Sequence, residues 1–221
     1  MCVAPARQPD SLIAWGRDDP TMAHLILVRH GQIAANLTQH WHGSTDSPLT
    51  PHGEREVELV ANYLSASGRT VSAIYASPLQ RTRDTGQGIA AALRLPLALD
   101  PALREYGIGE LEGTHYKDLQ EQQFFMRVAA DHEYAPAGGE SIAAVARRVA
   151  AALQRISDAH RGKEVVVVSH GAALGIALGH LLHGDPLKWR EYSIRNCSIT
   201  ELKLRPAPRL LRLNHVAHLH A

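Results

Sequence analysis

Two apolar runs, each followed by a histidine and a glycine, dominate the pattern of hydrophobic and polar positions along the chain. Residues 25–28 and 165–168 are entirely apolar and rich in β-branched side chains, which is typical of strands buried on both faces. The first run leads into Arg-His-Gly at 29–31 and the second into Ser-His-Gly at 169–171. If the two strands are parallel, both imidazoles lie at the carboxyl edge of one sheet, where open α/β sheets bind ligands.

Helical periodicity occupies most of the segments between the apolar runs. Thr50 followed by Pro51 is a favourable helix start, and apolar residues expected to face the sheet follow it: Val57, Val60, Ala61 and Leu64. A Ser-x-x-Gln sequence beginning at Ser77 predicts a capped helix that runs to about Leu93. Further helices are expected at about 116–130, 142–156 and 171–182, and further strands at 71–76, 96–99, 199–204 and 210–213. Strands that alternate with helices predict an α/β sandwich with a mostly parallel sheet.

Composition narrows the class of protein. The net charge of +1 gives no strong field that would favour nucleic acid or a membrane as a partner, and no apolar run approaches the ~20 residues needed to span a bilayer. Residues 1–22 are irregular and lack the apolar core of a signal peptide, so we expect a flexible extension there and one domain at 23–221. The expected location is the cytoplasm.

Cysteine and histidine usage argues against a disulfide framework and against a metal site. The two cysteines are Cys2 and Cys197, and the first falls in the expected extension. The 14 histidines are numerous, but their two clusters lack a neighbouring group of carboxylates or thiols. We therefore expect neither a metal nor a cofactor.

The motifs that carry chemistry resemble those of the histidine phosphatase superfamily, the phosphoglycerate mutase-like proteins. The two His-Gly motifs match the family, and so does Ser-Pro-Leu-Gln-Arg at 77–81; outside that context Arg81 would be interpreted as a solvated helix charge. The resemblance implies a three-layer α/β/α sandwich in which His30 attacks phosphorus and carries a phosphohistidine. It also implies that Arg29, Arg81 and a protonated His170 hold the phosphoryl oxygens, which two guanidinium groups can contact in bidentate fashion.

The resemblance assigns further roles around this core. Glu105 corresponds to the general acid, although Glu110 and Glu112 share its glycine-rich loop and spacing alone does not choose between them. Asn36 matches a position that contacts the phosphate, and Gly171 would let the substrate approach closely. Two positions depart from the family pattern, because Ile33 stands where a hydroxyl residue is usual and His42 where a glutamine is frequent. We expect His42 to contact the substrate and both departures to alter contacts with the leaving group.

Three functions remain to be distinguished. Cofactor-dependent phosphoglycerate mutases carry an Arg directly after the acid and an Arg-rich insertion, whereas this chain has Tyr106 there and Arg127 as the single Arg between Gly113 and Gly138. These missing cations favour hydrolysis of a small phosphorylated metabolite over the mutase reaction. A non-catalytic relative that binds a phosphorylated ligand is the third possibility, although no residue of the catalytic core is missing. A homodimer is compatible with each of them.

Overall fold

A single six-stranded sheet forms the centre of the computed structural model, which describes residues 22–220. The strand order is β3-β2-β4-β1-β5-β6. The strands are β1 (His24–Arg29), β2 (Val71–Ala76), β3 (Leu97–Leu99), β4 (Glu164–Ser169), β5 (Ile199–Lys203) and β6 (Arg209–His215). The first four pair in parallel, whereas β5 runs antiparallel to β1 and β6 antiparallel to β5. The predicted mostly parallel sheet with a C-terminal hairpin is confirmed.

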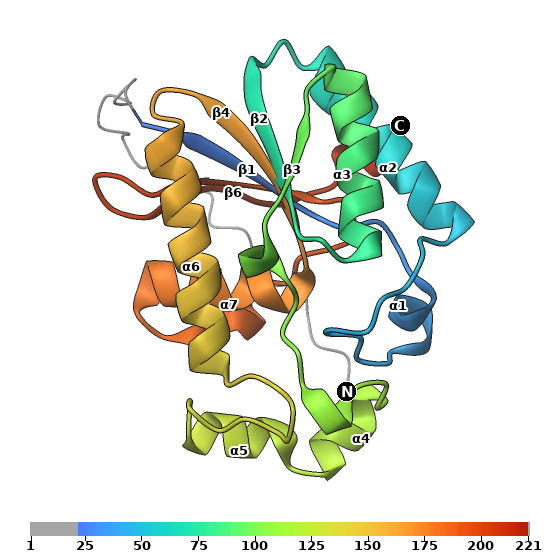
Figure 1. Ribbon diagram of the computed structural model, residues 1–221, viewed down its shortest axis with the longest axis vertical. Helices are drawn as coiled ribbons and strands as arrows, with labels where there is room; N and C mark the ends of the chain where they lie inside the picture. The colour runs from blue at the N-terminus through green and yellow to red at the C-terminus, as the bar shows by residue number, and fades with distance from the viewer. Residues whose placement is uncertain (1–21, 221) are drawn as a thin grey trace.

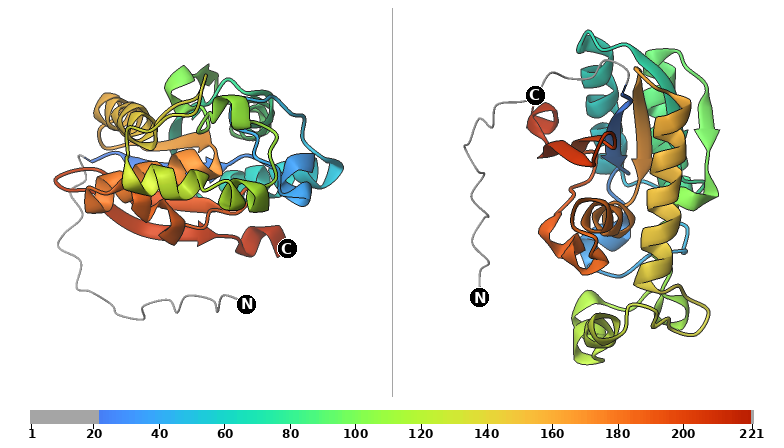
Figure 2. Two further views of the ribbon diagram at one scale, coloured as in Figure 1. Left: turned by 90° about the horizontal axis from the view of Figure 1, so that it is seen from below. Right: turned by 90° about the vertical axis from the view of Figure 1, so that its left-hand side faces the viewer.

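Helices cover both faces of the sheet, which gives the predicted three layers. One face packs against α2 (Pro51–Ala66) and α3 (Gln80–Leu93), and the other against α6 (Ile142–Ala159) and α7 (Gly171–His183). Figure 1 shows α6 on one side of the sheet and α2 and α3 on the other, and Figure 2 shows the layers from two further directions. Successive residues of β1 alternate between the two cores, with Leu25 and Leu27 in one and Ile26 and Val28 in the other. Covering both faces explains why this strand is apolar throughout.

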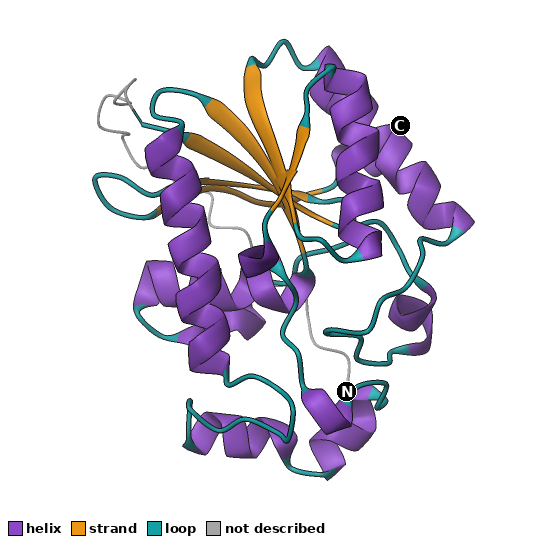
Figure 3. Cartoon of the chain, in the orientation of Figure 1, coloured by secondary structure: helices purple, strands orange, loops and turns teal. Residues whose placement is uncertain are grey.

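Short elements lie beyond the carboxyl edge of the sheet. They are α1 (Ala34–Thr38), α4 (Tyr116–Glu121) and α5 (Phe124–Ala130), and Figure 3 shows the last two past the ends of the strands. Between Met22 and His220 four 3-10 turns complete the set, η1 (Pro101–Leu103), η2 (Gly109–Leu111), η3 (Pro186–Glu191) and η4 (Ala217–His220). The prediction of one helix over 116–130 is wrong, because Gln123 takes a left-handed conformation with φ of 58° that a right-handed helix cannot contain.

The two predicted helix starts had different outcomes. Thr50 caps α2 as expected, because its side chain accepts a hydrogen bond from the Gly53 N–H at 3.0 Å. The predicted capping box at Ser77 is wrong, because α3 begins at Gln80. Asp46, from a distant loop, instead accepts the Gln80 N–H at 2.7 Å, and the Ser77 hydroxyl lies 2.9 Å from His170 Nε2.

The expected N-terminal extension, 1–22, lies outside the described residues except for Met22. From Met22 to His220, no helix is both long enough and apolar enough to cross a bilayer. All six named strands of this part of the chain belong to the same sheet.

Candidate active site

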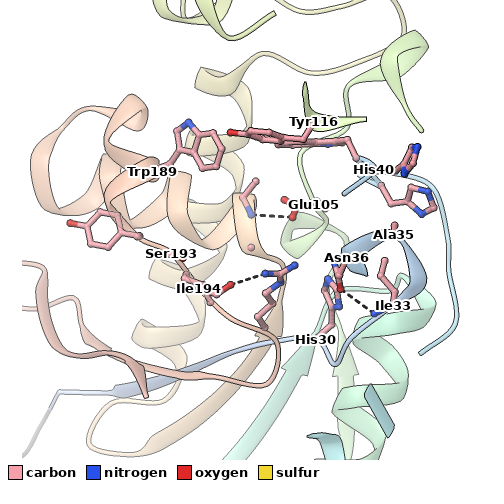
Figure 4. Close-up of a pocket in the computed structure, with 16 residues that line it drawn as sticks. His30, Ile33, Ala35, Asn36, His40, Glu105, Tyr116, Trp189, Ser193 and Ile194 are labelled. Atoms are coloured by element: carbon pink, nitrogen blue, oxygen red, sulfur yellow. Dashed lines mark hydrogen bonds between the residues drawn. The ribbon is translucent and has the colours of Figure 1, made fainter. Parts of the chain in front are cut away.

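A cavity of about 300 Å³ opens at the carboxyl edge of the sheet, beside the end of β1 and the start of α7. Figure 4 shows its lining, and six of the residues predicted for the site are part of it: Arg29, His30, Asn36, His42, Glu105 and Gly171. Arg81 and His170 do not line the cavity and lie behind it. The parallel pairing of Arg29 with Ser169 brings the ends of β1 and β4 together, so that the rings of His30 and His170 are 5.3 Å apart.

The structure fixes which nitrogen of His30 is free to react. Nδ1 lies 2.7 Å from the carbonyl oxygen of Gly31, and because that oxygen can only accept, Nδ1 carries the hydrogen. The lone pair of the neutral ring is therefore on Nε2. The side chain is buried, and desolvation together with the charges of Arg29 and Arg81 lowers the pKa of His30 well below its ordinary value.

This lowered pKa gives a spectroscopic prediction. We expect the ring of His30 to stay neutral as the pH falls through about 6.5, where an unperturbed histidine takes up a proton, and to protonate only in more acidic solution. NMR titration of the histidine ring carbon-bound protons, with His30 assigned by substitution, would measure this. A His30 signal that titrates at its unperturbed position would contradict the electrostatic description.

Arg29 has a donor that no protein atom uses. Its Nη1 donates to the carbonyl oxygen of Ile194 at 2.8 Å, whereas Nε is buried without a hydrogen-bond partner. The guanidinium lies against Gly171, where an added Cβ would stand 3.3 Å from Cζ. Because Gly171, the first residue of α7, has no side chain, the Arg29 guanidinium can lie directly against it in the wall of the cavity.

The hydrogen bonds of His170 differ from those expected of the protonated ring predicted from the sequence. Arg81 Nε donates to His170 Nδ1 at 3.2 Å, so Nδ1 carries no hydrogen and Nε2–H donates to Ser77 Oγ. Burial, reinforced by the charges of Arg81 and His30, lowers the pKa of His170 well below its ordinary value. The hydrogen-bond pattern and the direction of the pKa shift both favour a neutral ring over the predicted protonated one.

Arg81 is fully buried and supports the cavity from behind. Besides its bond to His170, it donates from Nη1 and Nη2 to the carbonyl oxygens of His42, Gly43 and Thr45 at 2.8–3.0 Å. It thereby fixes the loop that carries His42, whose own ring contacts the Ser47 hydroxyl at 2.7 Å. Direct contact of Arg81 with a phosphoryl oxygen stays a prediction.

Of the three acidic residues in the glycine-rich loop, Glu105 is the one that lines the cavity. Its carboxylate accepts N–H groups from Tyr106 at 2.8 Å, Ala172 at 3.1 Å and Ala173 at 2.6 Å. The last two belong to the first turn of α7, whose positive end favours an acidic group there. These bonds place the carboxyl group in the same cavity as His30.

The other two acids have different surroundings. Glu110 is exposed. Glu112 accepts N–H groups of Gly43, Ser44, Thr45 and Ile108 at 2.8–3.3 Å, as well as the Thr45 hydroxyl. Burial alone would raise the pKa of Glu112, but these donors outweigh it and leave the pKa below its ordinary value. Glu112 therefore ties two loops of the site together.

Asn36 is oriented by a residue that the sequence analysis missed. Its Oδ1 accepts the Ile33 N–H at 3.0 Å and Asn196 Nδ2 at 3.1 Å, which leaves the amide NH₂ as the free end. Asn196 Nδ2 also donates to the carbonyl oxygen of His30 at 2.8 Å. The sequence offered one signal for Asn196, which is a polar residue shortly before a buried strand. Its contact with His30, however, joins two residues that are 166 positions apart. The unusual Ile33 presents an apolar side chain to the cavity.

Arg148 of α6 is a second residue that sequence reasoning missed. Its guanidinium pairs with Glu140 and donates to three backbone carbonyl oxygens, those of Ala102, Arg104 and Glu105, at 2.7–3.0 Å. It thus holds the backbone from which the Glu105 side chain projects. A second arginine precedes it, and the apolar period alone does not show which of the two faces inward.

Removing Arg148 is expected to destabilise the protein and displace Glu105. Arg148→Ala leaves Glu140 and three carbonyl oxygens without their donor, and we expect a loss of about 1–3 kcal/mol in the free energy of unfolding. Arg147→Ala is the matched control, because that neighbour pairs with Glu133 in solvent, where both side chains are 60% exposed. Denaturant titration should show a lower midpoint for Arg148→Ala and almost no change for Arg147→Ala. Equal midpoints would contradict the anchoring role.

Across residues 22–220, no group of three or more His, Cys, Asp or Glu side chains is arranged to hold a metal ion.

Known proteins resemble this chain in sequence and in fold. A family model, the histidine phosphatase superfamily (branch 1), matches residues 25–215. A Yersinia enterocolitica protein named "Probable phosphoglycerate mutase GpmB" is 36% identical over 190 residues, covering 85% of this chain and 87% of that protein. The solved phosphoserine phosphatase of Entamoeba histolytica, in complex with 3-phosphoglyceric acid, is 30% identical with a TM-score of 0.80, covering 90% of this chain and 100% of that one. A mycobacterial glucosyl-3-phosphoglycerate phosphatase, solved with VO3, is 26% identical with a TM-score of 0.76, covering 87% and 99% of the two chains. By its sequence and by its fold, this chain belongs to the histidine phosphatase superfamily.

Proposed function

We propose that the chain is a phosphomonoesterase that hydrolyses a small phosphorylated substrate through a phosphohistidine on His30. The observation that carries the proposal is the bond from His30 Nδ1 to the Gly31 carbonyl, which leaves Nε2 unprotonated, with its lone pair free, in a ring that lines the cavity. A neutral imidazole is a competent nucleophile near neutral pH without a separate strong base. The solved structures of similar fold that are named as phosphatases support a phosphatase activity.

The reaction divides into two displacements at phosphorus. His30 Nε2 forms a bond to phosphorus while the P–O bond to the alcohol breaks, and Glu105 in its protonated form gives its proton to the departing oxygen. Water then attacks phosphorus, the P–N bond breaks, and the Glu105 carboxylate takes the proton from the water. The products are the alcohol and inorganic phosphate, and both His30 and Glu105 return to their starting states.

Arg29 would stabilise the transferring group. Its unused Nε–H and the free NH₂ of Asn36 are donors beside His30, and phosphoryl transfer depends chiefly on positioning and on neutralising equatorial oxygen charge. Arg81 would act from behind, since its charge favours an anion in the cavity and its bonds fix the loop at 42–45.

A mutase is the second candidate, because the named Yersinia relative supports it. A phosphoglycerate mutase must also hold a carboxylate and a second phosphate, and both require cations. Within the described part of the chain, Arg29 is the one Lys or Arg that lines the cavity. This charge distribution favours hydrolysis, in which a single phosphate is bound and released.

Product analysis with 3-phosphoglycerate distinguishes the two activities. The protein is given 3-phosphoglycerate together with 2,3-bisphosphoglycerate. We expect any 2-phosphoglycerate to form no faster than the protein releases inorganic phosphate from a phosphomonoester such as p-nitrophenyl phosphate. ³¹P NMR of the reaction mixture follows all species at once. Rapid interconversion of the two monophosphates would overturn the phosphatase assignment.

A further inference from the structure

We propose that the alcohol part of the substrate carries a flat aromatic ring, which packs against an aromatic wall formed by Trp41, Tyr116 and Trp189. All three side chains line the same cavity as His30. This inference rests on the proposed phosphomonoesterase function and specifies the class of substrate.

The wall lies where the leaving group must be. In Figure 4, Tyr116 and Trp189 lie across the cavity from His30, and Glu105 lies between them and the nucleophile. A phosphoryl group at His30 with its bridging oxygen near Glu105 therefore directs the rest of the substrate toward the aromatic wall. The polar groups of the cavity contact the phosphate end, and the rings contact the alcohol end.

Contacts among its own rings and with Phe125 hold the wall in place. Trp41 follows α1, Tyr116 begins α4 and Trp189 belongs to η3, so three separate segments contribute to it. The centroids of Trp41 and Trp189 are 6.5 Å apart, and Phe125 backs the wall at 6.3 Å from Trp41, 5.1 Å from Tyr116 and 6.4 Å from Trp189. These distances are typical of stable edge-to-face and tilted ring pairs. The three wall residues remain partly exposed, so they keep ring surface available for a ligand.

The charges around the wall favour an uncharged ring over a carboxylate or a second phosphate. Arg29 is the one Lys or Arg among the described residues that line the cavity, and it lies at the phosphate end. Arg190 does not line the cavity, and its guanidinium lies over two rings instead, 4.8 Å from the Phe125 centroid and 5.7 Å from that of the wall residue Trp189. An aromatic surface beside a small number of polar groups that fix orientation is a usual arrangement for binding a ring-bearing ligand.

Binding of matched phosphonates tests the inference without requiring turnover. Benzylphosphonate and ethylphosphonate carry the same anionic group and differ in the ring, and titration calorimetry gives their dissociation constants. We expect benzylphosphonate to bind at least 10-fold more tightly. Tyr116→Ala and Trp189→Ala should each reduce this ratio several-fold, whereas Tyr116→Phe and Trp189→Phe, which keep a ring, should largely preserve it. Met126→Ala, an exposed position on α5 outside the cavity, is the control for the fold and should leave the ratio unchanged.

Kinetics with benzyl, cyclohexylmethyl and ethyl phosphate complete the test, since all three release primary alcohols. A preference for benzyl over both other substrates in kcat/KM supports an aromatic site. Equal values for all three, equal phosphonate affinities, or a clear preference for a sugar phosphate or 3-phosphoglycerate would overturn the inference. Turnover without ring preference refutes this inference alone. Ring-selective phosphonate binding without any hydrolysis refutes the proposed function and leaves the aromatic site supported.

Discussion

Replacing His30 with alanine is expected to reduce turnover of every phosphomonoester by roughly 10⁴-fold or more. The variant loses the nitrogen that would form the bond to phosphorus, and the neighbouring His170 is not free to replace it. His170 lies behind the cavity, with Nδ1 accepting from Arg81 and Nε2 donating to Ser77. Initial rates of phosphate release from p-nitrophenyl phosphate measure the loss, and circular dichroism verifies the fold.

His52→Ala is the matched control, because that side chain is 66% exposed on α2 and lies outside the cavity. It should retain the rate of the unmodified protein. Substantial residual turnover in His30→Ala, with His52→Ala unchanged, would mean that another group attacks phosphorus.

Replacing Glu105 with glutamine should give an effect that depends on the leaving group. On an alkyl phosphate the departing oxygen needs a proton, and we expect a loss of about 10²–10⁴-fold in kcat/KM. With p-nitrophenyl phosphate the phenolate leaves unassisted, so the phosphoenzyme forms but its hydrolysis slows. Stopped-flow absorbance should therefore show a burst of nitrophenol followed by slow turnover. Glutamine keeps one oxygen that can accept a hydrogen bond. Its NH₂ group would face the N–H of either Ala172 or Ala173, so that one of these two hydrogen bonds is lost.

Two neighbouring carboxylates serve as comparisons. Glu110→Gln should leave both substrates almost unchanged, because Glu110 is exposed. Glu112→Gln should lower activity on both substrates alike, because it weakens the bonds that tie the loop at 43–45 to the glycine-rich loop. A leaving-group dependence at either of these positions, and not at Glu105, would show that the acid lies elsewhere.

The local pattern of apolar residues was sufficient to predict the strand that leads to His30 and its parallel neighbour. The runs at 25–28 and 165–168 are apolar because helices cover both faces of the sheet, and this burial is visible in the sequence itself. The Thr50 cap also depends on residues within one turn. The family motifs, with their known order along the chain, then predicted that His30 and Glu105 lie close together.

Several features of the site depend on contacts between residues far apart in the sequence and could not be predicted from it. The Ser77 hydroxyl lies 2.9 Å from His170 Nε2, although 93 residues separate the two, and it makes only a longer contact of 3.4 Å with the Leu79 N–H before α3. Arg81 turns most of its donors to loop carbonyls and one to His170, which favours the neutral form of that ring. Asn196 and Arg148 likewise act on segments far from them in sequence. Each depends on tertiary contacts that no local spacing encodes.

Locating the covalent phosphate tests the central claim most directly. The protein is mixed with p-nitrophenyl phosphate, quenched in base within milliseconds and digested, and tandem mass spectrometry identifies the modified peptide. Glu105→Gln should increase the trapped amount, because its phosphoenzyme is hydrolysed slowly. We predict one acid-labile, base-stable phosphate on Nε2 of His30, whereas a phosphate on Ser, Asp or His170, or none in either protein, would contradict the mechanism.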